Sequence, residues 1–104
     1  MYRVTTPEHT FTLPSDVSNY KIVQITYKQG STKIVKVYAN GEASSGMTVR
    51  GQTVVILLTQ EETKKLKANT ATVQVRALTQ QDRAVASKRF EFSIDEVNNE
   101  EILK

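Results

Sequence analysis

Residues Val54 to Arg76 read VVILLTQEETKKLKANTATVQVR, and three local patterns follow one another within this stretch. The apolar run 54–58 is β-branched at its start and only five residues long, which is typical of a buried strand rather than of a helix. From Ala71 onward apolar and polar residues alternate, which predicts a second strand with one apolar face. That face consists of Ala71, Val73, Val75 and Ala77.

The segment between these two expected strands carries the signals of a short capped helix. Thr59 is followed three residues later by Glu62, so each side chain can bond the backbone N–H of the other in a capping box. Acidic residues occupy the first turn and basic residues the last, the order that a helix dipole favours. The charged residues are Glu61, Glu62, Lys64, Lys65 and Lys67. Asn69 is expected to end the helix in a left-handed conformation.

Alternating patterns elsewhere predict five more strands. They span residues 10–13, 20–28, 32–39, 47–49 and 84–94. The sequence Gln29-Gly30-Ser31 is a turn signal, so the strands on either side of it are expected to pair as a hairpin. In the strand after this turn, one face carries Val35 and Val37, and the other carries Ile34, Lys36 and Tyr38. In the last strand, one face is expected to carry Ala84, Ala86, Phe90, Phe92 and Ile94.

The expected fold class is all-β, an immunoglobulin-like antiparallel β-sandwich of about seven strands with one short helix. Turns recur at intervals of roughly 8–12 residues, which is typical of such sandwiches. Single apolar faces argue against a parallel sheet, whose strands are covered on both sides and read as continuous apolar runs. The helix is expected at the crossover between strands five and six, where the chain passes from one sheet to the other. A small closed barrel is the competing architecture.

The chain of 104 residues is expected to form one domain, 1–104, with a loose N-terminal arm (1–8) and an acidic C-terminal tail (95–104). The absence of cysteine excludes disulfide scaffolds and cysteine-based zinc sites, and it fits a reducing cytoplasm. The N-terminus has no apolar h-region, so no cleaved signal peptide is expected. No apolar run approaches the roughly 20 residues of a membrane span, so no membrane association is expected.

Residues that carry catalysis or bind metals do not form a motif in this sequence. His9 is the only histidine, and no second metal ligand lies near it in the chain. The carboxylate pair Glu61-Glu62 is explained by helix capping, and the other two pairs lie in the polar tail. Neither a G-x-S-x-G elbow nor a glycine-rich phosphate loop is present. We therefore expect no enzyme, no catalytic residue, no metal and no cofactor.

Nucleic-acid binding is an alternative function that the composition raises. Tyr20, Tyr27 and Tyr38 lie on expected strands and are candidate stacking surfaces beside several lysines and arginines. The 14 basic and 11 acidic residues are interspersed, however, and the formal net charge is only +3. We therefore expect the tyrosines to fill and edge the core, and nucleic acid is not an expected partner.

Four segments of the chain, taken in order, resemble small structural proteins encoded by tailed phages and prophages of Gram-positive bacteria. The segments are TFTLP (10–14), YKIVQITYKQG (20–30), VILLTQEETKKL (55–66) and TVQVRALTQQDRAVAS (72–87). The most specific part is LTQEET, followed about ten residues later by VQVR. A looser similarity is to the N-terminal immunoglobulin-like domain of phage baseplate upper proteins. The resemblance covers residues 11–103, which is most of the chain.

The resemblance implies a non-catalytic virion or virion-assembly protein of the head, the head–tail junction or the tail and baseplate. Its partners would be other phage structural proteins, and it would act as a homo-oligomer or as repeated copies in a particle. It would be found in the host cytoplasm during assembly and then in the virion. A stand-alone β-sandwich module that binds nucleic acid or carbohydrate is the alternative.

The candidate contact residues lie in the glycine- and serine-rich loop 40–46 and at the end of the tail. Mobile segments of this composition often become ordered when a protein joins an assembly. The candidates are Asn40, Gly41, Glu42, Ser44, Ser45, Ile102 and Leu103. The arms at the two termini are expected to reach a neighbouring molecule.

Overall fold

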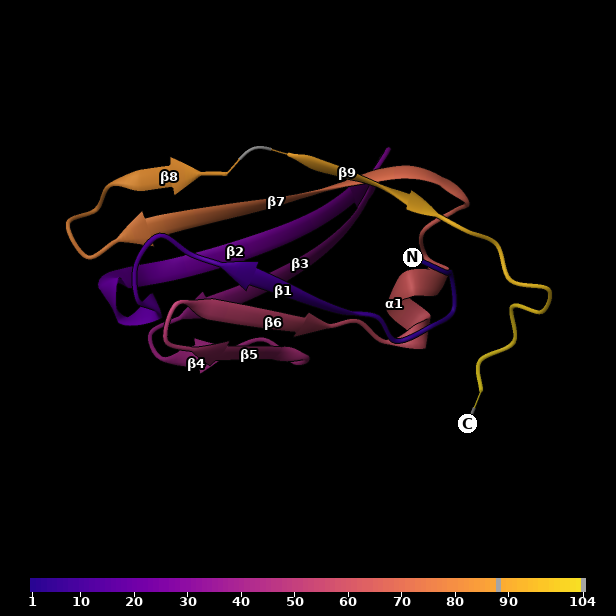
Figure 1. Cartoon of the computed structure of the whole chain (residues 1–104), viewed down its shortest axis with the longest axis horizontal. Coiled ribbons are helices and arrows are strands. Elements are labelled where there is room, and N and C mark those ends of the chain that lie inside the picture. Colours follow the sequence, from indigo (N-terminus) through magenta and orange to yellow (C-terminus); the bar gives the residue numbers. More distant parts are fainter. Residues whose placement is uncertain (88, 104) are drawn as a thin grey trace.

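Two antiparallel sheets pack face to face in the computed structural model, which describes residues 1–87 and 89–103 (Figure 1). The smaller sheet has the strand order β1-β6-β5, and the larger has the order β4-β3-β2-β7-β8, with β9 also paired to β7. The strands of the smaller sheet are β1 (Glu8–Thr12), β5 (Met47–Arg50) and β6 (Thr53–Leu57). Those of the larger sheet are β2 (Tyr20–Gln29), β3 (Thr32–Ala39), β4 (Glu42–Ala43), β7 (Asn69–Thr79), β8 (Ala84–Ala86) and β9 (Phe90–Ile94).

The strand order confirms the expected immunoglobulin-like sandwich. The sheets of an immunoglobulin variable domain have the orders A-B-E-D and C″-C′-C-F-G. With β1 taken as strand B, this chain has the orders B-E-D and C″-C′-C-F-G, in which β8 and β9 share the G position. The described residues therefore place no strand at position A, beside β1. A short 3-10 helix, Val17–Asn19, joins β1 to β2.

The core lies between the sheets and is formed by the inward faces of β2, β6 and β7. On β2 and β6, the completely buried residues are Val23, Ile25, Tyr27, Val54 and Ile56. The predicted inward face of β7 is confirmed, because its four residues are all at most 8% exposed. Since β7 pairs with β2 on one side and with β8 and β9 on the other, it is covered on both edges.

The helix α1 (Gln60–Lys64) lies at the crossover between β6 and β7, as expected. Its capping box is complete: the Glu62 N–H donates to Thr59 Oγ1 over 3.1 Å, and the Thr59 N–H donates to Glu62 Oε1 over 2.9 Å. Both interactions are local, because they join residues three apart in the chain. The start of the helix is thus specified by its own sequence.

We expect Thr59→Ala to lower the free energy of unfolding by about 1 kcal/mol, because the Glu62 N–H loses its acceptor. Urea denaturation followed by far-UV circular dichroism measures this loss. Thr59→Ser keeps the hydroxyl and is the matched control that should retain most of the stability. An unchanged free energy for Thr59→Ala would mean that water satisfies the N–H equally well.

The end of α1 differs from the expectation at Asn69. Lys65 caps the helix with a right-handed φ of −68°, and Asn69 is the first residue of β7 rather than a left-handed terminator. Leu66 is completely buried just after the helix. The Gln29 side chain then holds the backbone of Lys67 through hydrogen bonds of 2.6 and 2.8 Å. These tertiary contacts direct the chain into β7 before it reaches Asn69.

The last expected strand, 84–94, is divided into β8 and β9, and the division changes the register on β7. Ala86 pairs with Arg76, whereas Phe90 pairs with Val73. The distance from Ala86 to Phe90 is four positions along this edge, whereas the distance between their partners, Arg76 and Val73, is three positions along β7. Because of this one extra position, the alternation of side chains between the two faces of the sheet is reversed in β9 relative to β8. The prediction that Ala86 and Phe90 share a face is therefore wrong.

A serine side chain accounts for the division between β8 and β9. The Ser87 N–H donates to the Val75 carbonyl over 2.8 Å, and Ser87 Oγ accepts from the Val75 N–H over 3.0 Å. The hydroxyl thus takes the place of a backbone carbonyl in the ladder. Before the shift, Val85 lies opposite Ala77, and after it, Phe92 lies opposite Ala71. Val85 and Phe92 consequently share the inward side of this edge.

The first residues of the chain do not form the loose arm that their composition predicted. Arg3 and Val4 are 8% and 7% exposed, and Tyr2 forms a parallel β-bridge with Asp95, just beyond β9. The N-terminal ammonium group also donates to the Ser93 carbonyl over 3.0 Å. The N-terminal segment therefore extends the edge of the larger sheet at the end of β9.

The Arg3 guanidinium joins both termini to the end of α1. It donates to the backbone carbonyls of Lys64 and Leu66 and to the carboxylates of Glu96 and Glu100. A guanidinium has five N–H donors in a rigid fork, so one side chain can serve several acceptors. These contacts explain why the terminal segments lie against the domain, which their polar composition did not indicate.

Candidate interaction surfaces

The predicted contact residues of loop 40–46 lie in different local environments. Asn40 and Gly41 have φ angles of +54° and +80° in the turn between β3 and β4, and exposed Glu42 begins β4. Ser44 is half-buried, and its hydroxyl accepts from the Val37 N–H and donates to the Val37 carbonyl over 2.9 and 3.1 Å. The composition predicted one mobile loop, whereas the structure has a tight turn there that pairs β3 with the short strand β4. The Ser44 side chain binds the backbone of β3.

Ser45 and the C-terminal tail lie beside the same hollow, which the sequence did not indicate. Ser45, Gly46, Leu57 and Ile102 line one hollow of about 490 Å³ beside the start of α1. We call it the junction hollow. Leu57 is 46% exposed within it. The structure therefore brings together two of the predicted contact segments, while Asn40, Gly41 and Glu42 lie apart from them.

The Gln60 side chain holds the tail beside the junction hollow. Its Nε2 donates to the Leu103 carbonyl, and its Oε1 accepts from the Leu103 N–H, each over 2.8 Å. The Leu103 side chain is 77% exposed. An exposed leucine fixed by its backbone presents apolar area without the entropic cost of ordering a free tail.

A largely buried ion pair between Lys36 and Glu62 holds Ser45, one of the residues that line the junction hollow. The Lys36 side chain is 8% exposed, and its Nζ lies 2.7 Å from Glu62 Oε2 and donates to the Ser45 carbonyl over 2.8 Å. Burial tends to raise the pKa of Glu62, but the hydrogen bonds from Lys36 and Thr59 and the Lys36 charge hold the pKa below its ordinary value. The ion pair thus fixes α1 and Ser45 to β3.

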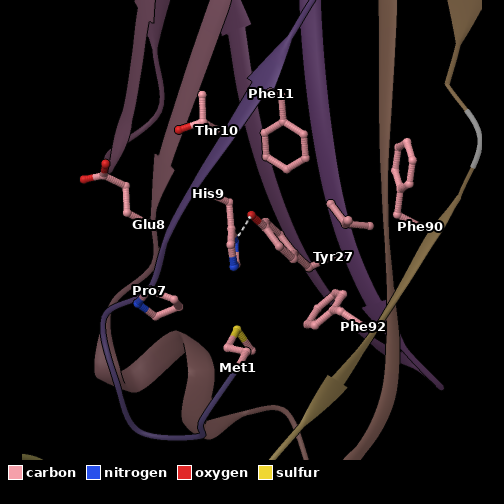
Figure 2. A pocket seen from close by; sticks show the side chains of 10 residues that line it. Met1, Pro7, Glu8, His9, Thr10, Phe11, Tyr27, Phe90 and Phe92 are labelled. Atoms are coloured by element: carbon pink, nitrogen blue, oxygen red, sulfur yellow. Dashed lines mark hydrogen bonds between the residues drawn. The ribbon is translucent and has the colours of Figure 1, made fainter.

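A second hollow, of about 540 Å³, lies between β1 and β9 (Figure 2). We call it the aromatic hollow. Its main lining residues are Met1, His9, Phe11, Tyr27, Phe90 and Phe92. Tyr27 and Phe92 meet edge to face, with ring centroids 6.1 Å apart and an interplanar angle of 87°. The Phe90 side chain is 53% exposed at its rim.

The polar group of the aromatic hollow is the pair formed by His9 and Tyr27. His9 Nδ1 and Tyr27 Oη are 2.7 Å apart. Burial and the nearby N-terminal charge lower the pKa of His9, while burial and the Glu62 charge raise the pKa of Tyr27. At neutral pH both groups are therefore uncharged, and the hydrogen bond joins a phenol to a neutral imidazole whose tautomer sets which of the two donates. Within the described residues, no group of three His, Cys, Asp or Glu side chains is arranged to hold a metal ion.

Acidification through the range of histidine titration is expected to destabilise the protein because of His9. Its folded pKa lies below the ordinary value of 6.5, so the unfolded chain binds the proton first and stability falls as the pH drops below that value. The lowered carboxyl pKa values of Glu62 and Asp16 act only below their ordinary values of 4.5 and 3.8. Melting temperatures measured between about pH 7.5 and about pH 5 should therefore isolate His9.

His9→Gln is the matched variant for this titration, because the amide oxygen can accept from Tyr27 and does not titrate. We expect its melting temperature to fall less over the same pH range than that of the unmodified chain. Equal falls for the two proteins would show that His9 does not contribute to the pH dependence.

The tyrosines proposed as stacking surfaces are largely in the interior. Tyr20 and Tyr27 are 7% and 0% exposed, and Tyr38 is partly buried against the core. The expectation that tyrosines fill and edge the core is thus confirmed for these three residues. Lys36, one of the basic residues beside them, is bound to Glu62 in the interior.

The fold and its surfaces define the class of the protein as an immunoglobulin-like β-sandwich domain with two apolar hollows. No helix in the described part of the chain is long and apolar enough to cross a membrane. Comparisons of the chain with protein-family models, with curated proteins and with solved structures find no match.

The aromatic hollow was not predicted from the sequence, although part of its signal was present. His9 and Phe11 alternate with exposed neighbours in β1, and Phe90 and Phe92 alternate in β9. Each pair reads as the inward face of an ordinary strand. The position of β1 at an open edge of the smaller sheet is what leaves these side chains accessible.

Proposed function

We propose that this protein is a non-catalytic structural component of a tailed-phage particle, in the head, the head–tail junction or the tail, and that it acts through protein–protein contacts. The observation that carries the proposal is the presence of two apolar hollows on different surfaces of one small domain. A subunit of a repeated array needs more than one contact surface, because it must join neighbours on different sides.

The two hollows lie on opposite sides of the smaller sheet. Val54 and Ile56 of β6 point inward, so Leu57 and the junction hollow lie on the outer face of that sheet. The aromatic hollow opens at the β1 edge, between the sheets. Grouped apolar side chains mark protein contacts more reliably than single exposed ones. The resemblance of LTQEET and VQVR to phage structural proteins supports the same role.

Mass spectrometry of purified particles from a phage or prophage that encodes this chain tests the proposal. We expect the protein in mature particles, in a constant ratio to the other particle proteins. Its absence from both mature particles and assembly intermediates would contradict the proposed role. A strongly salt-dependent shift of single-stranded DNA by the pure protein would favour the alternative of a nucleic-acid-binding module.

A pair of variants tests whether the junction hollow is a contact surface in the particle. Leu57→Asp places a charge in the hollow and is expected to reduce incorporation. Thr48→Asp places the same charge on exposed β5 of the same sheet, outside the hollow, and serves as the control. Equal incorporation of the two folded variants would remove the junction hollow from the proposed contacts.

A further inference from the structure

One edge of the smaller sheet presents backbone groups that face away from the sheet. The Leu58 N–H donates to the Pro7 carbonyl over 3.1 Å, and the Leu13 N–H donates to the Gln52 carbonyl over 2.7 Å. In an antiparallel ladder, alternate residues direct both backbone groups toward the partner strand. The odd-numbered residues from 7 to 13 therefore face β6. The N–H and C=O groups of Glu8, Thr10 and Thr12 face outward, and within the described residues they have no partner.

The other sheet edges carry the features that normally prevent a further strand from pairing. β4 has only two residues, and the outer edge is interrupted between β8 and β9. The end of β9 is covered by the bridge between Tyr2 and Asp95. On β5, the Met47 N–H is taken by the Ser44 carbonyl over 3.1 Å. Short strands, interruptions and covering segments all block edge pairing. Among the described strands, β1 has none of these features along its five residues.

An apolar groove accompanies the unpaired edge of β1. The aromatic hollow lies beside the first part of the strand. A third hollow, of about 260 Å³, lies just past the end of β1, and its lining includes Leu13, Val75, Ala77 and Val85. Phe90 and Val85 are 53% and 44% exposed along this side. The groove occupies the position of the absent strand A, so an added strand would gain both backbone partners and apolar cover.

We propose that a second copy of this chain pairs its own β1 with this edge, antiparallel and about a twofold axis. This inference rests on the proposed structural function and names one of its partners. An axis through Thr10 places Thr10 opposite Thr10 of the second copy and Glu8 opposite Thr12 of the second copy. Each copy then donates three N–H groups and accepts at three carbonyls, from the outward-facing residues of β1.

The side chains of β1 suit this self-pairing. On the outer face, the two Glu8 carboxylates lie at opposite ends of the paired strands, each beside a threonine, so no like charges meet. On the inner face, His9 lies opposite Phe11 of the second copy, and aromatic cross-strand pairs are favourable. The open sides of the two sandwiches then face each other. Phe90 and Val85, exposed in one copy, are brought to the side where the second copy lies.

Sedimentation equilibrium of the full chain over a range of concentrations tests the pairing. We expect a reversible dimer for the unmodified protein. Thr10→Pro removes an N–H that the ladder with β6 does not use, so the sandwich should still fold. It removes one donor from each copy, and we expect the dimer to dissociate at least about tenfold more readily. Val49→Pro is the matched control, because its N–H faces outward on the other edge of the same sheet, and it should leave the dimer unchanged.

Amide hydrogen exchange supplies a second measurement, which does not depend on a variant. The amides of Glu8, Thr10 and Thr12 should exchange slowly at high protein concentration and quickly at low concentration. Thr10→Lys, which places a charge on the edge, replaces the proline variant if that variant does not fold. A monomer at all concentrations, or a dimer that Thr10→Pro and Thr10→Lys both leave intact, overturns the inference.

These outcomes separate the pairing from the proposed function. A monomeric protein that is still found in phage particles would refute only the pairing through β1. A dimer that is absent from particles would refute only the structural role. Protection of the Thr10 amide by an added extended peptide, in a protein that stays monomeric, would assign the edge to a different partner and overturn the second copy as occupant.

Discussion

Val75→Asp is expected to abolish the native state or to reduce the free energy of unfolding by about 4 kcal/mol or more. Val75 is 8% exposed at the centre of β7, where it pairs with Ile25, which is completely buried. A carboxylate there would lose its hydration without gaining a partner. Small domains have a total stability of only about 5–15 kcal/mol, so a loss of this size removes most of it. Urea denaturation, or the melting temperature if folding persists, measures the effect.

The matched control for this substitution is Val35→Asp in the same sheet. Val35 is 43% exposed on the outer face of β3, so its replacement keeps the new charge in water and is expected to change stability by less than about 1 kcal/mol. A melting transition for Val75→Asp that equals that of the unmodified protein would mean that the inward face of β7 is assigned to the wrong residues.

Glu62→Ala is expected to have the second largest effect, a loss of about 3 kcal/mol. The substitution removes the partner of Lys36, whose side chain is only 8% exposed, and leaves a buried ammonium group with the Ser45 carbonyl as its remaining acceptor. It also removes the half of the capping box that bonds the Thr59 N–H. Both losses act on the connection between β6 and β7, so chemical denaturation should detect them together.

Two further variants separate the ion pair from the helix cap. Glu61→Ala removes a neighbouring carboxylate from the exposed side of α1 and is expected to have little effect. Lys36→Met combined with Glu62→Gln removes both charges and retains similar volumes, so it should recover much of the loss. If Glu62→Ala were as stable as Glu61→Ala, the Lys36 ammonium group would have to be hydrated in the folded protein.

The parts of the fold that were predicted from the sequence depend on short separations along the chain. The capping box joins Thr59 to Glu62, and the hairpin of β2 and β3 surrounds the turn at Gly30, where φ is +58°. The inward face of β7 follows from the alternation of a single strand. Each of these features is specified by residues that are close together in the sequence, so it can be predicted from the sequence alone.

Other features could not be predicted, because their partners are distant in the sequence. Lys36 lies on the inward face of β3 while Val35 lies outward. Alternation alone did not decide between these two faces, and the partner that compensates the buried Lys36 charge, Glu62, lies on α1, far away in the sequence. The polar N-terminus lies against the domain because Arg3 finds acceptors at the end of α1 and in the tail.

The candidate surfaces show the same division. Composition indicated loop 40–46 and the tail as contact segments, and the structure joins Ser45 to Ile102 in the junction hollow. The sequence does not show that these two segments are close in space, since their proximity depends on the crossover at α1. The aromatic hollow depends on Phe11 and Phe90, which belong to different sheets and are brought together only when the sandwich forms.

By itself, the sequence determined that the chain forms antiparallel strands with single apolar faces and that Thr59 begins its helix, because period-two alternation and a three-residue cap are local properties. Only the tertiary structure decided which face of β3 is buried, where the last strand is interrupted and which edge remains unpaired. Those outcomes depend on the sum of contacts between segments tens of residues apart. The surfaces proposed for assembly, the aromatic hollow and the edge of β1, belong to this second group.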